Sequence, residues 1–278
     1  MKRVIIRRVR TGARGVPMMK ARGIPTAGNR QPGLKLIDNQ TLNKFNPAML
    51  GLGDISSPSQ EIEAVAAVFD LSGFTKFCTQ VDGHLAVPKF LNDFLEWFFR
   101  RIRIGLTKEN CGSRSSFWLD LPILVKFLGD GILLLWNARG MTENQICKIV
   151  SILHDTCYDY KHHFYPQISR MVVKPPSVLR CGVARGRVFS VGNGRDYVGH
   201  CINNASRLVQ LRVLSFCFPH RGFPVQEYMP TEHFRLFVQK CLPIRGVGEE
   251  ELVWVAKEEF DNLPEESQGL FSDPAASY

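Results

Sequence analysis

Two apolar segments, each of which breaks at an aspartate into a glycine-containing turn, constrain the fold of this chain more than any other feature. Residues 62–70 (IEAVAAVFD) form a nearly continuous apolar run that ends at Asp70, as is typical of a strand buried at the centre of a sheet. Residues 121–136 (LPILVKFLGDGILLLW) read as two apolar strands around a Gly-Asp-Gly turn that contains Asp130. We therefore predict adjacent strands that each carry an aspartate at one end.

Helical patterns alternate with these strands. Apolar residues recur at helical spacing from Val87 to Ile102, and Pro88 suits the first turn of such a helix. The order β-α-β-β-α-β, with additions, predicts an α+β fold on the ferredoxin-like plan. The other expected elements are helices at 142–164 and 201–212, a strand and hairpin at 178–192, and strands at 215–219 and 252–256.

The positive charge of the chain lies in its first 35 residues. The formal net charge is +9, but residues 1–35 hold ten Lys or Arg and no acid, which leaves 25 basic against 26 acidic residues elsewhere. We predict a basic, flexible arm and lead-in at 1–58, a folded domain at 59–257, and a loose acidic tail at 258–278. A basic arm of this kind is more often solubilising than a binding element, so we expect no stable nucleic-acid partner.

Composition also indicates where the chain resides. No apolar run approaches the roughly 20 residues that span a bilayer, and the basic start lacks the apolar stretch of a secretory signal. The eight cysteines show no zinc-type spacing, and several lie in apolar runs where a reduced thiol packs as a small hydrophobe. We expect a cytoplasmic protein with no membrane partner.

The two aspartates carry the strongest chemical signal. Each one alone is typical of an ordinary turn. Both, however, lie beside glycine at the end of an apolar strand, and adjacent strands would bring the carboxylates to one pair of divalent metal ions. The LSGFT segment after Asp70 adds backbone N–H groups near an expected helix start, which suits a triphosphate.

A third polar pair lies on the expected helix at 201–212. Asn203 and Arg207 are four residues apart and would share one helix face. An amide and a guanidinium that project together can stabilise charge that develops on a phosphorus centre. Taken alone, Asn203 and Arg207 could equally be ordinary polar residues on a helix surface without a role in chemistry.

The segments FDLSGFT, KFLGDG and VGHCINNASRL together resemble the three signature segments of class III adenylate/guanylate cyclase catalytic domains. The resemblance covers residues 62–256 in order and spacing. It implies conversion of a nucleoside triphosphate to a 3′,5′-cyclic monophosphate and pyrophosphate, with two divalent metal ions, Mn²⁺ or Mg²⁺, as cofactors. It also implies a head-to-tail homodimer whose interface joins metal ligands of one protomer to base- and phosphate-contacting residues of the other.

The resemblance assigns roles by position. Asp70, Asp130 and the backbone carbonyl of Leu71 would bind the metal ions. Asn203 and Arg207 would orient the ribose and stabilise the transition state. The implied substrate-binding residues are Lys126, Asp196, Gly73, Phe74, Thr75 and Arg245.

Lys126 and Asp196 do not by themselves choose a base. Asp accepts from an exocyclic amine and Lys donates to a ring nitrogen, which fits adenine, but cytosine presents the same groups and uracil fits with the partners exchanged. A wider resemblance, through AVPKFLNDFLEWFF and RCGVARGRVFSVGNGRDYVG, is to the bacterial pyrimidine cyclases of the Pycsar anti-phage systems. It implies that infection triggers synthesis of a cyclic pyrimidine nucleotide, which activates a separate effector protein. We favour UTP as substrate and cyclic UMP as product.

Four alternatives remain at this stage. A cytidylate cyclase of the same system or an adenylate cyclase would use the same residues on another base. A catalytically silent nucleotide sensor would keep the fold without needing Asp70, Asp130, Asn203 and Arg207. A nucleic-acid binder that works through the basic arm would show salt-dependent affinity and leaves the acidic pair unexplained.

Overall fold

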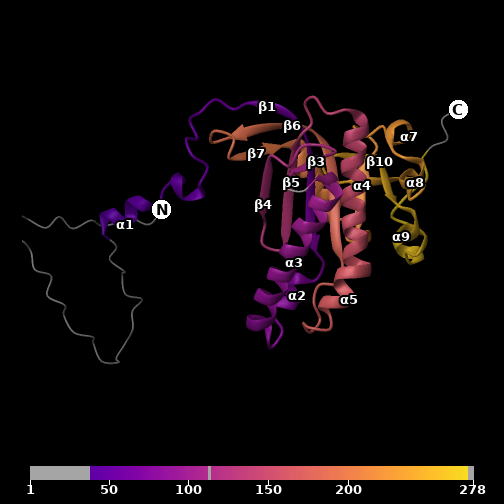
Figure 1. Cartoon of the computed structure of the whole chain (residues 1–278), viewed down its shortest axis with the longest axis horizontal. Helices are drawn as coiled ribbons and strands as arrows, with labels where there is room; N and C mark the ends of the chain where they lie inside the picture. The colour runs from indigo at the N-terminus through magenta and orange to yellow at the C-terminus, as the bar shows by residue number, and fades with distance from the viewer. Residues whose placement is uncertain (1–37, 112–113, 275–278) are drawn as a thin grey trace, which may run out of the picture. The chain divides into compact units, whose positions relative to one another are not determined.

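The computed structural model describes residues 38–111 and 114–274, so the predicted basic arm at 1–35 lies outside the described residues. The chain divides into two compact units, 1–46 and 47–278. In the first, α1 (Asn39–Lys44) is capped by Asp38, whose carboxylate accepts a 2.8 Å hydrogen bond from the Thr41 N–H. All the other elements belong to the second unit (Figure 1).

Within the described residues, eight strands form one sheet in the order β4-β5-β1-β6-β8-β10-β9, with β7 paired to β6. The central strand β1 is antiparallel to both of its neighbours, β5 and β6, and β4 is antiparallel to β5. The strands are β1 (Glu61–Leu71), β4 (Leu124–Phe127), β5 (Gly131–Asn137), β6 (Leu179–Val191), β7 (Asp196–Gly199), β8 (Phe216–Pro219), β9 (Phe237–Ile244) and β10 (Gly248–Ala256). With two crossover helices, this arrangement confirms the predicted ferredoxin-like α+β fold.

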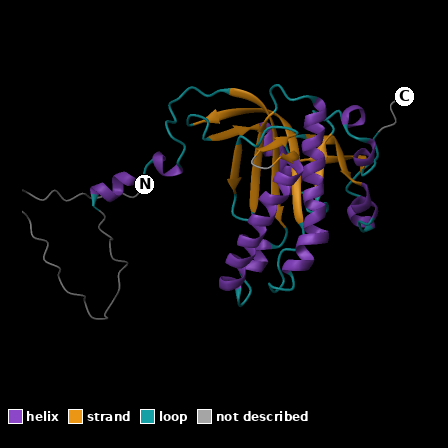
Figure 2. Ribbon diagram, viewed as in Figure 1, coloured by secondary structure: helices purple, strands orange, loops and turns teal. Residues whose placement is uncertain are grey.

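Different helices pack on the two faces of the central strand, and the long helices of one face lie in front of the sheet in Figure 2. Alternate residues of β1 point to opposite faces. Val65, Ala67 and Phe69 share one buried cluster with α3 (Gly83–Leu106) and α4 (Glu143–Asp159). Ala64 and Ala66 pack in a second cluster with buried residues of α6 (His200–Val209). The even-numbered residues of β1, Asp70 among them, therefore lie on the α6 face of the sheet.

Shorter elements complete the unit. Those before β6 are η1 (Pro47–Leu50), α2 (Phe74–Cys78), the hairpin of β2 (Thr107–Cys111) and β3 (Arg114–Phe117), the π-helix η2 (Tyr160–Phe164) and α5 (Tyr165–Ile168). Those after β8 are α7 (Val225–Tyr228), α8 (Thr231–Phe234), α9 (Lys257–Asp261) and α10 (Glu265–Gln268). Among the described helices, none combines the length and the apolar content needed to cross a membrane.

Two local predictions were wrong. Pro88 lies inside α3 instead of in its first turn, because the N–H groups of Leu85 and Ala86 already bond to the carbonyl of Asp82 and start the helix at Gly83. The second concerns the strand and hairpin predicted at 178–192: the strand is confirmed as β6, which continues to Val191, but the hairpin turn lies after it and leads to β7.

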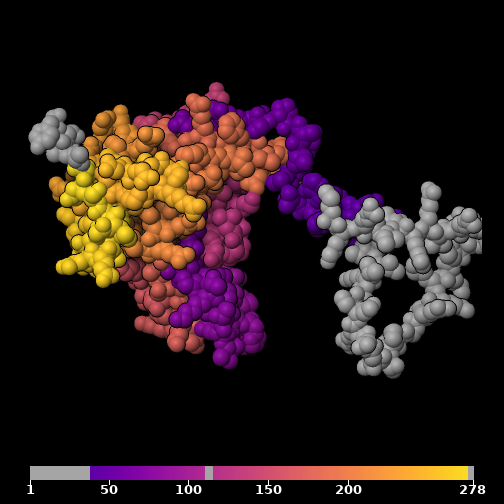
Figure 3. Space-filling view, turned by 180° about the vertical axis from the view of Figure 1, so that it is seen from behind, coloured from indigo at the N-terminus to yellow at the C-terminus, as the bar shows by residue number. Residues whose placement is uncertain are grey.

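The acidic C-terminal segment is ordered as far as it is described, whereas the sequence predicted a loose tail. Phe260 is buried, and its ring meets that of Phe271 edge to face at 5.4 Å. Ser272 forms an isolated antiparallel bridge with Cys241 of β9. Apolar side chains spaced among the acidic residues anchor this segment. The acidic composition alone does not indicate this packing. Seen from behind, the yellow C-terminal residues form part of the surface beside the orange segments (Figure 3).

Candidate active site

Strand pairing brings the two aspartates together. Asp70 lies opposite Gly131 in the β1–β5 register, and the N–H of Leu71 donates a 3.0 Å hydrogen bond to the carbonyl of Asp130. The turn requires glycine: a Cβ on Gly131 would lie 2.3 Å from the carbonyl oxygen of Phe69. The two carboxylates predicted from separate segments are therefore neighbours at one end of the central strands.

The electrostatics at Asp70 favour a cation. Burial is the largest influence that raises the pKa of Asp70, and the negative charge of Asp130 raises it further. The charges of Arg180 and Arg212 act in the opposite direction. Arg180 Nη1 lies 3.7 Å from Asp70 Oδ2, while its Nη2 donates a 2.8 Å hydrogen bond to Ser72 Oγ.

These residues fit a divalent metal ion of the Mg²⁺ or Mn²⁺ type. Carboxylate and carbonyl oxygens are the ligands such ions prefer, and a cation between Asp70 and Asp130 would relieve their mutual repulsion. The described part of the chain holds no group of three or more His, Cys, Asp or Glu side chains placed for a metal. Any ion here would need further ligands, and Mg²⁺ commonly takes these from substrate phosphates and water.

The three predicted contacts after Asp70 follow directly on the aspartate. Gly73 has φ of 82°, and its carbonyl accepts the Phe77 N–H at 3.0 Å to start α2. The ring of Phe74 packs 6.4 Å from that of Phe90, centroid to centroid, so this side chain serves the core. Thr75 is exposed. Their contact with a substrate remains a prediction.

Lys126 and Asp196 meet across the sheet, although 70 residues separate them in the sequence. The Nζ of Lys126 in β4 forms an ion pair and hydrogen bond with Oδ2 of Asp196 at the start of β7. The second carboxylate oxygen of Asp196 accepts the Tyr197 N–H at 2.9 Å. The pair predicted to contact the base is thus assembled within one protomer.

Asn203 and Arg207 lie on α6, whose apolar side is buried against the sheet. Asn203 is exposed, and Arg207 Nη1 donates a 2.8 Å hydrogen bond to the carbonyl of Gly246 in the β9–β10 turn. The exposed Arg245 belongs to the same turn, so the structure brings it near Arg207. The predicted residues of α6 and of the β9–β10 turn thus form one group, which the hydrogen bond from Arg207 to Gly246 holds together.

Sequence reasoning missed Arg180 and Arg212. Arg180 is the register partner of Asp70 in β6, and only the pairing of these two distant strands shows it. A sequence signal did exist, because an arginine near the start of the apolar strand LRCGVA needs a partner for its charge. Arg212 lies in the left-handed region, at φ of 60°, in the loop after α6. No local pattern indicates that it lies near Asp70.

Comparison with known proteins identifies the fold. No family model matches the chain, and the curated proteins contain no match either. Among solved structures, the guanylyl cyclase Cya2 is similar to this chain. The match covers 71% of this chain and 93% of the Cya2 chain, with 16% sequence identity and a TM-score of 0.53. The chain has the fold of a nucleotide cyclase catalytic domain. The guanylate cyclase domain of RhGC from Catenaria anguillulae, solved in complex with GTP, also matches, over 71% of this chain and 98% of its own, at 16% identity and a TM-score of 0.47.

Within this cyclase fold, the two aspartates lie at the ends of central strands and the Asn203–Arg207 pair lies on α6 of the same protomer. A cavity of about 800 Å³ lies away from the aspartates, between α4, the loop before β8, and α9. The aspartates themselves are only partly buried. A ligand bound at them would therefore need further walls to exclude water.

Proposed function

We propose that this protein is a nucleotide cyclase that converts a nucleoside triphosphate into a 3′,5′-cyclic monophosphate and pyrophosphate. The observation that carries the proposal is the β1–β5 register, which makes Asp70 and Asp130 neighbours beside Arg180. A paired-carboxylate site next to a guanidinium suits a metal-bound triphosphate. The cyclase-like fold supports the same function.

In the proposed reaction, the ribose 3′-oxygen attacks the α-phosphorus and loses its proton. The bond between the α-phosphorus and the bridging oxygen breaks, and pyrophosphate leaves with that electron pair. Divalent ions held by Asp70, Asp130 and the Leu71 carbonyl would supply activation of the hydroxyl and neutralisation of phosphate charge. Arg180 lies where its planar fork can hold the phosphates. Gly73 and Thr75 would contact the triphosphate from the start of α2.

The complete site requires a second copy of the chain. Asn203 and Arg207 lie on α6, and Arg245 lies in the β9–β10 turn, where the carbonyl of Gly246 accepts the hydrogen bond from Arg207. In a head-to-tail homodimer, these donors would face the partner's metal ligands and stabilise charge on the reacting phosphorus. The Lys126–Asp196 pair would read the base.

We favour UTP as the substrate. Asp196 would accept the N–H of uracil, while Lys126 would donate to a neighbouring carbonyl, so the ion pair opens to hold one base edge. The choice of a pyrimidine rests on the resemblance to Pycsar cyclases, in which the cyclic nucleotide signals phage infection to a separate effector protein. A second candidate is an adenylate cyclase, because the same Lys–Asp pair also matches the donor and acceptor of adenine.

A panel of the four ribonucleoside triphosphates tests this proposal. The purified protein is incubated with Mn²⁺ and each triphosphate in turn, and the products are identified by mass spectrometry. Cyclic UMP is expected as the main product, since a hydrogen-bonding pocket can discriminate by about 10⁴-fold. Exclusive cyclic AMP would replace the pyrimidine assignment, and no cyclic product from any of the four would favour a silent nucleotide sensor. Asp70→Asn is the control, with product expected to vanish.

A further inference from the structure

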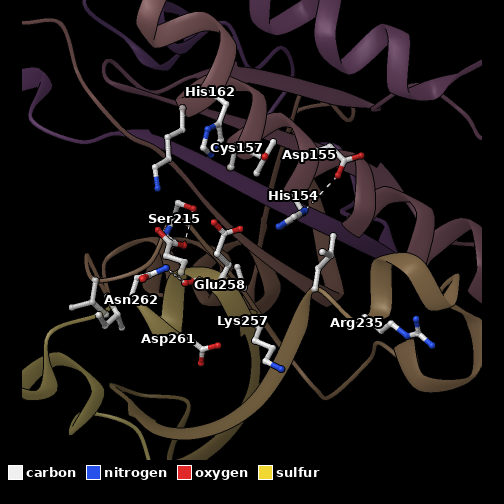
Figure 4. Close-up of a pocket in the computed structure, with 17 residues that line it drawn as sticks. His154, Asp155, Cys157, His162, Ser215, Arg235, Lys257, Glu258, Asp261 and Asn262 are labelled. Atoms are coloured by element: carbon white, nitrogen blue, oxygen red, sulfur yellow. Dashed lines mark hydrogen bonds and ion pairs between the residues drawn. The ribbon is translucent and has the colours of Figure 1, made fainter.

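Segments near both ends of the second unit hold loops of the sheet in place. Towards the C-terminus, Oε2 of Glu259 in α9 accepts two hydrogen bonds from Ser215, in the loop before β8, each of 2.8 Å. Both residues line the cavity between α4 and α9, where Ser215 lies among side chains of the C-terminal segment (Figure 4). Towards the N-terminus, residues 51–60 lead from η1 to β1 and pack on the turn between β6 and β7. We call residues 51–60 the lead-in strap.

Hydrogen bonds join the lead-in strap to the end of β6. The hydroxyl of Ser59 donates a 2.7 Å hydrogen bond to the carbonyl of Ser190, and the hydroxyl of Ser190 accepts the N–H of Gln60 at 2.9 Å. The N–H of Ser190 donates in turn to the carbonyl of Gln60, also at 2.9 Å. These bonds meet at Ser190, two residues before the turn that begins at Gly192.

The lead-in strap also lies directly against that turn. Gly192 has φ of 57°, and a Cβ at this position would lie 1.7 Å from the carbonyl oxygen of Leu52. Only glycine therefore allows the strap to approach the turn this closely. At the other end of the turn, Cδ of Arg195 lies 3.4 Å from the position that a Cβ on Gly53 would take. The strap thus contacts both the first and the last residue of the turn.

The residue that follows this turn is Asp196. Its carboxylate pairs with Nζ of Lys126, and in the β6–β7 ladder it is the register partner of Val191. The turn from Gly192 to Arg195 therefore sets the position of the Asp196 carboxylate relative to Lys126. A displacement of about 1 Å would be enough to weaken recognition by this pair, because hydrogen bonds are sensitive to both distance and angle.

We propose that the lead-in strap is a positioning element for base recognition, which holds the β6–β7 turn so that Asp196 stays beside Lys126. This inference rests on the proposed cyclase function, in which the Lys126–Asp196 pair reads the base. The strap acts through the backbone of the turn, because it contacts Arg195, the residue before Asp196. Selectivity among bases therefore depends on a segment outside the β-α-β-β-α-β core.

Two glycines of the same turn provide a matched pair of variants. Both are left-handed, with φ of 57° at Gly192 and 76° at Gly194, so alanine introduces similar backbone strain at each. A Cβ on Gly192 would push the strap away at Leu52, whereas among the described residues a Cβ on Gly194 would meet only the hydroxyl of Tyr197, at 3.5 Å. Gly192→Ala therefore displaces the strap, and Gly194→Ala controls for the strained turn.

The readout is the affinity for each of the four ribonucleoside 5′-monophosphates, measured by calorimetry, because these probes carry the bases but have no pyrophosphate to release. The ratio between the tightest and the next-tightest probe gives the base selectivity. Gly192→Ala is expected to lower this ratio about tenfold, and Gly194→Ala to keep it within about twofold of wild type. An unchanged ratio in Gly192→Ala, or equal weakening of all four probes, would overturn the proposal.

A double-mutant cycle tests whether the strap acts through Asp196. In the Asp196→Ala background, Gly192→Ala should change the selectivity ratio less than about twofold. An equal loss of selectivity in both backgrounds would overturn the proposal. If Gly192→Ala does not fold, Ser59→Ala takes its place, because it removes the exposed strap hydroxyl that donates to Ser190. The expected loss of selectivity is then about threefold, and an unchanged ratio in that variant would be equally decisive against the proposal.

The two proposals fail in different ways. A wild-type protein that makes no cyclic nucleotide, yet loses base selectivity on Gly192→Ala, would contradict the cyclase function and leave the role of the strap intact. A wild-type protein that makes cyclic nucleotide, with Gly192→Ala as selective as wild type, would contradict the role of the strap alone. A wild-type protein that binds all four bases equally would also overturn the role of the strap, because it would have no base recognition to position.

Discussion

Asp70 is less stable as a carboxylate in the folded protein than in the unfolded chain. Burial and the neighbouring charge of Asp130 raise its pKa, and Arg180 and Arg212 only partly oppose this. The folded state therefore binds this proton more tightly than the unfolded chain does. The resulting stabilisation is fully present below the ordinary aspartate pKa of about 3.9 and is lost as the pH rises through the raised value.

Removing this charge should stabilise the metal-free protein at neutral pH. Asp70→Asn is expected to raise Tm by about 2 °C at pH 7 in the presence of a chelator, and to give no advantage below about pH 3.5, where the wild-type carboxyl is protonated. Thermal unfolding followed by circular dichroism across this pH range measures the difference. A variant that is no more stable than wild type at pH 7 would contradict the raised pKa.

At the level of elements, the C-terminal segment contributes to the stability of the fold. The ring of Phe260 packs in a cluster with Leu214 and Cys217, and the Nζ of Lys240 lies 4.5 Å from its centroid. These contacts join α9 to β8 and β9. The sequence pattern indicated only an acidic tail here, because the apolar anchors Phe260, Leu263 and Phe271 follow no helical or strand period.

Phe260→Ala should therefore destabilise the whole second unit. Deleting a buried aromatic ring costs about 3 kcal/mol of unfolding free energy, at the lower end of the usual range because the site lies at the edge of the core. Urea unfolding gives the value, and Leu270→Ala, an exposed position in the same segment, serves as the control. A loss below about 0.5 kcal/mol would mean that the segment is loose after all.

At the scale of the whole molecule, the question is how two groups of residues in one protomer form one site. Asp70 and Asp130 belong to the ends of β1 and the β4–β5 hairpin, while Asn203 and Arg207 belong to α6. The guanidinium of Arg207 is directed to the carbonyl of Gly246. In the head-to-tail dimer that we propose, each protomer would offer one group to each of two sites.

Complementation between two inactive variants tests that arrangement. Asp70→Asn and Arg207→Ala should each lower kcat by at least ~100-fold, since each removes charge stabilisation from both sites of its homodimer. An equal mixture of the two, allowed to exchange subunits, should recover about a quarter of wild-type activity, because half of the dimers then hold one intact site. Two differently tagged preparations of Asp70→Asn should recover none. Failure of the productive mixture, with exchange confirmed by pull-down, would rule out a shared site.

The sequence alone predicted the central elements and their order along the chain. The apolar runs, the helical periodicity of α3 and the Gly-Asp-Gly turn are local patterns, and they predicted the ferredoxin-like α+β fold that the structure confirms. The meeting of Asp70 with Asp130 was also expected, because each aspartate follows an apolar strand and these strands were predicted to be adjacent. Start and end points of elements were less predictable, as Pro88 shows, since they depend on which residue first satisfies the backbone donors.

Only the tertiary structure decided which residues surround the aspartates. Arg180 lies opposite Asp70 through a strand register that spans 110 residues of sequence, and the loop before β8 is held by Glu259 near the end of the chain. Such contacts join residues that are distant in sequence, and their cause is packing and charge pairing in three dimensions. Local periodicity carries no information about packing or charge pairing between distant residues. The neighbours of the aspartates could therefore be identified only from the tertiary structure.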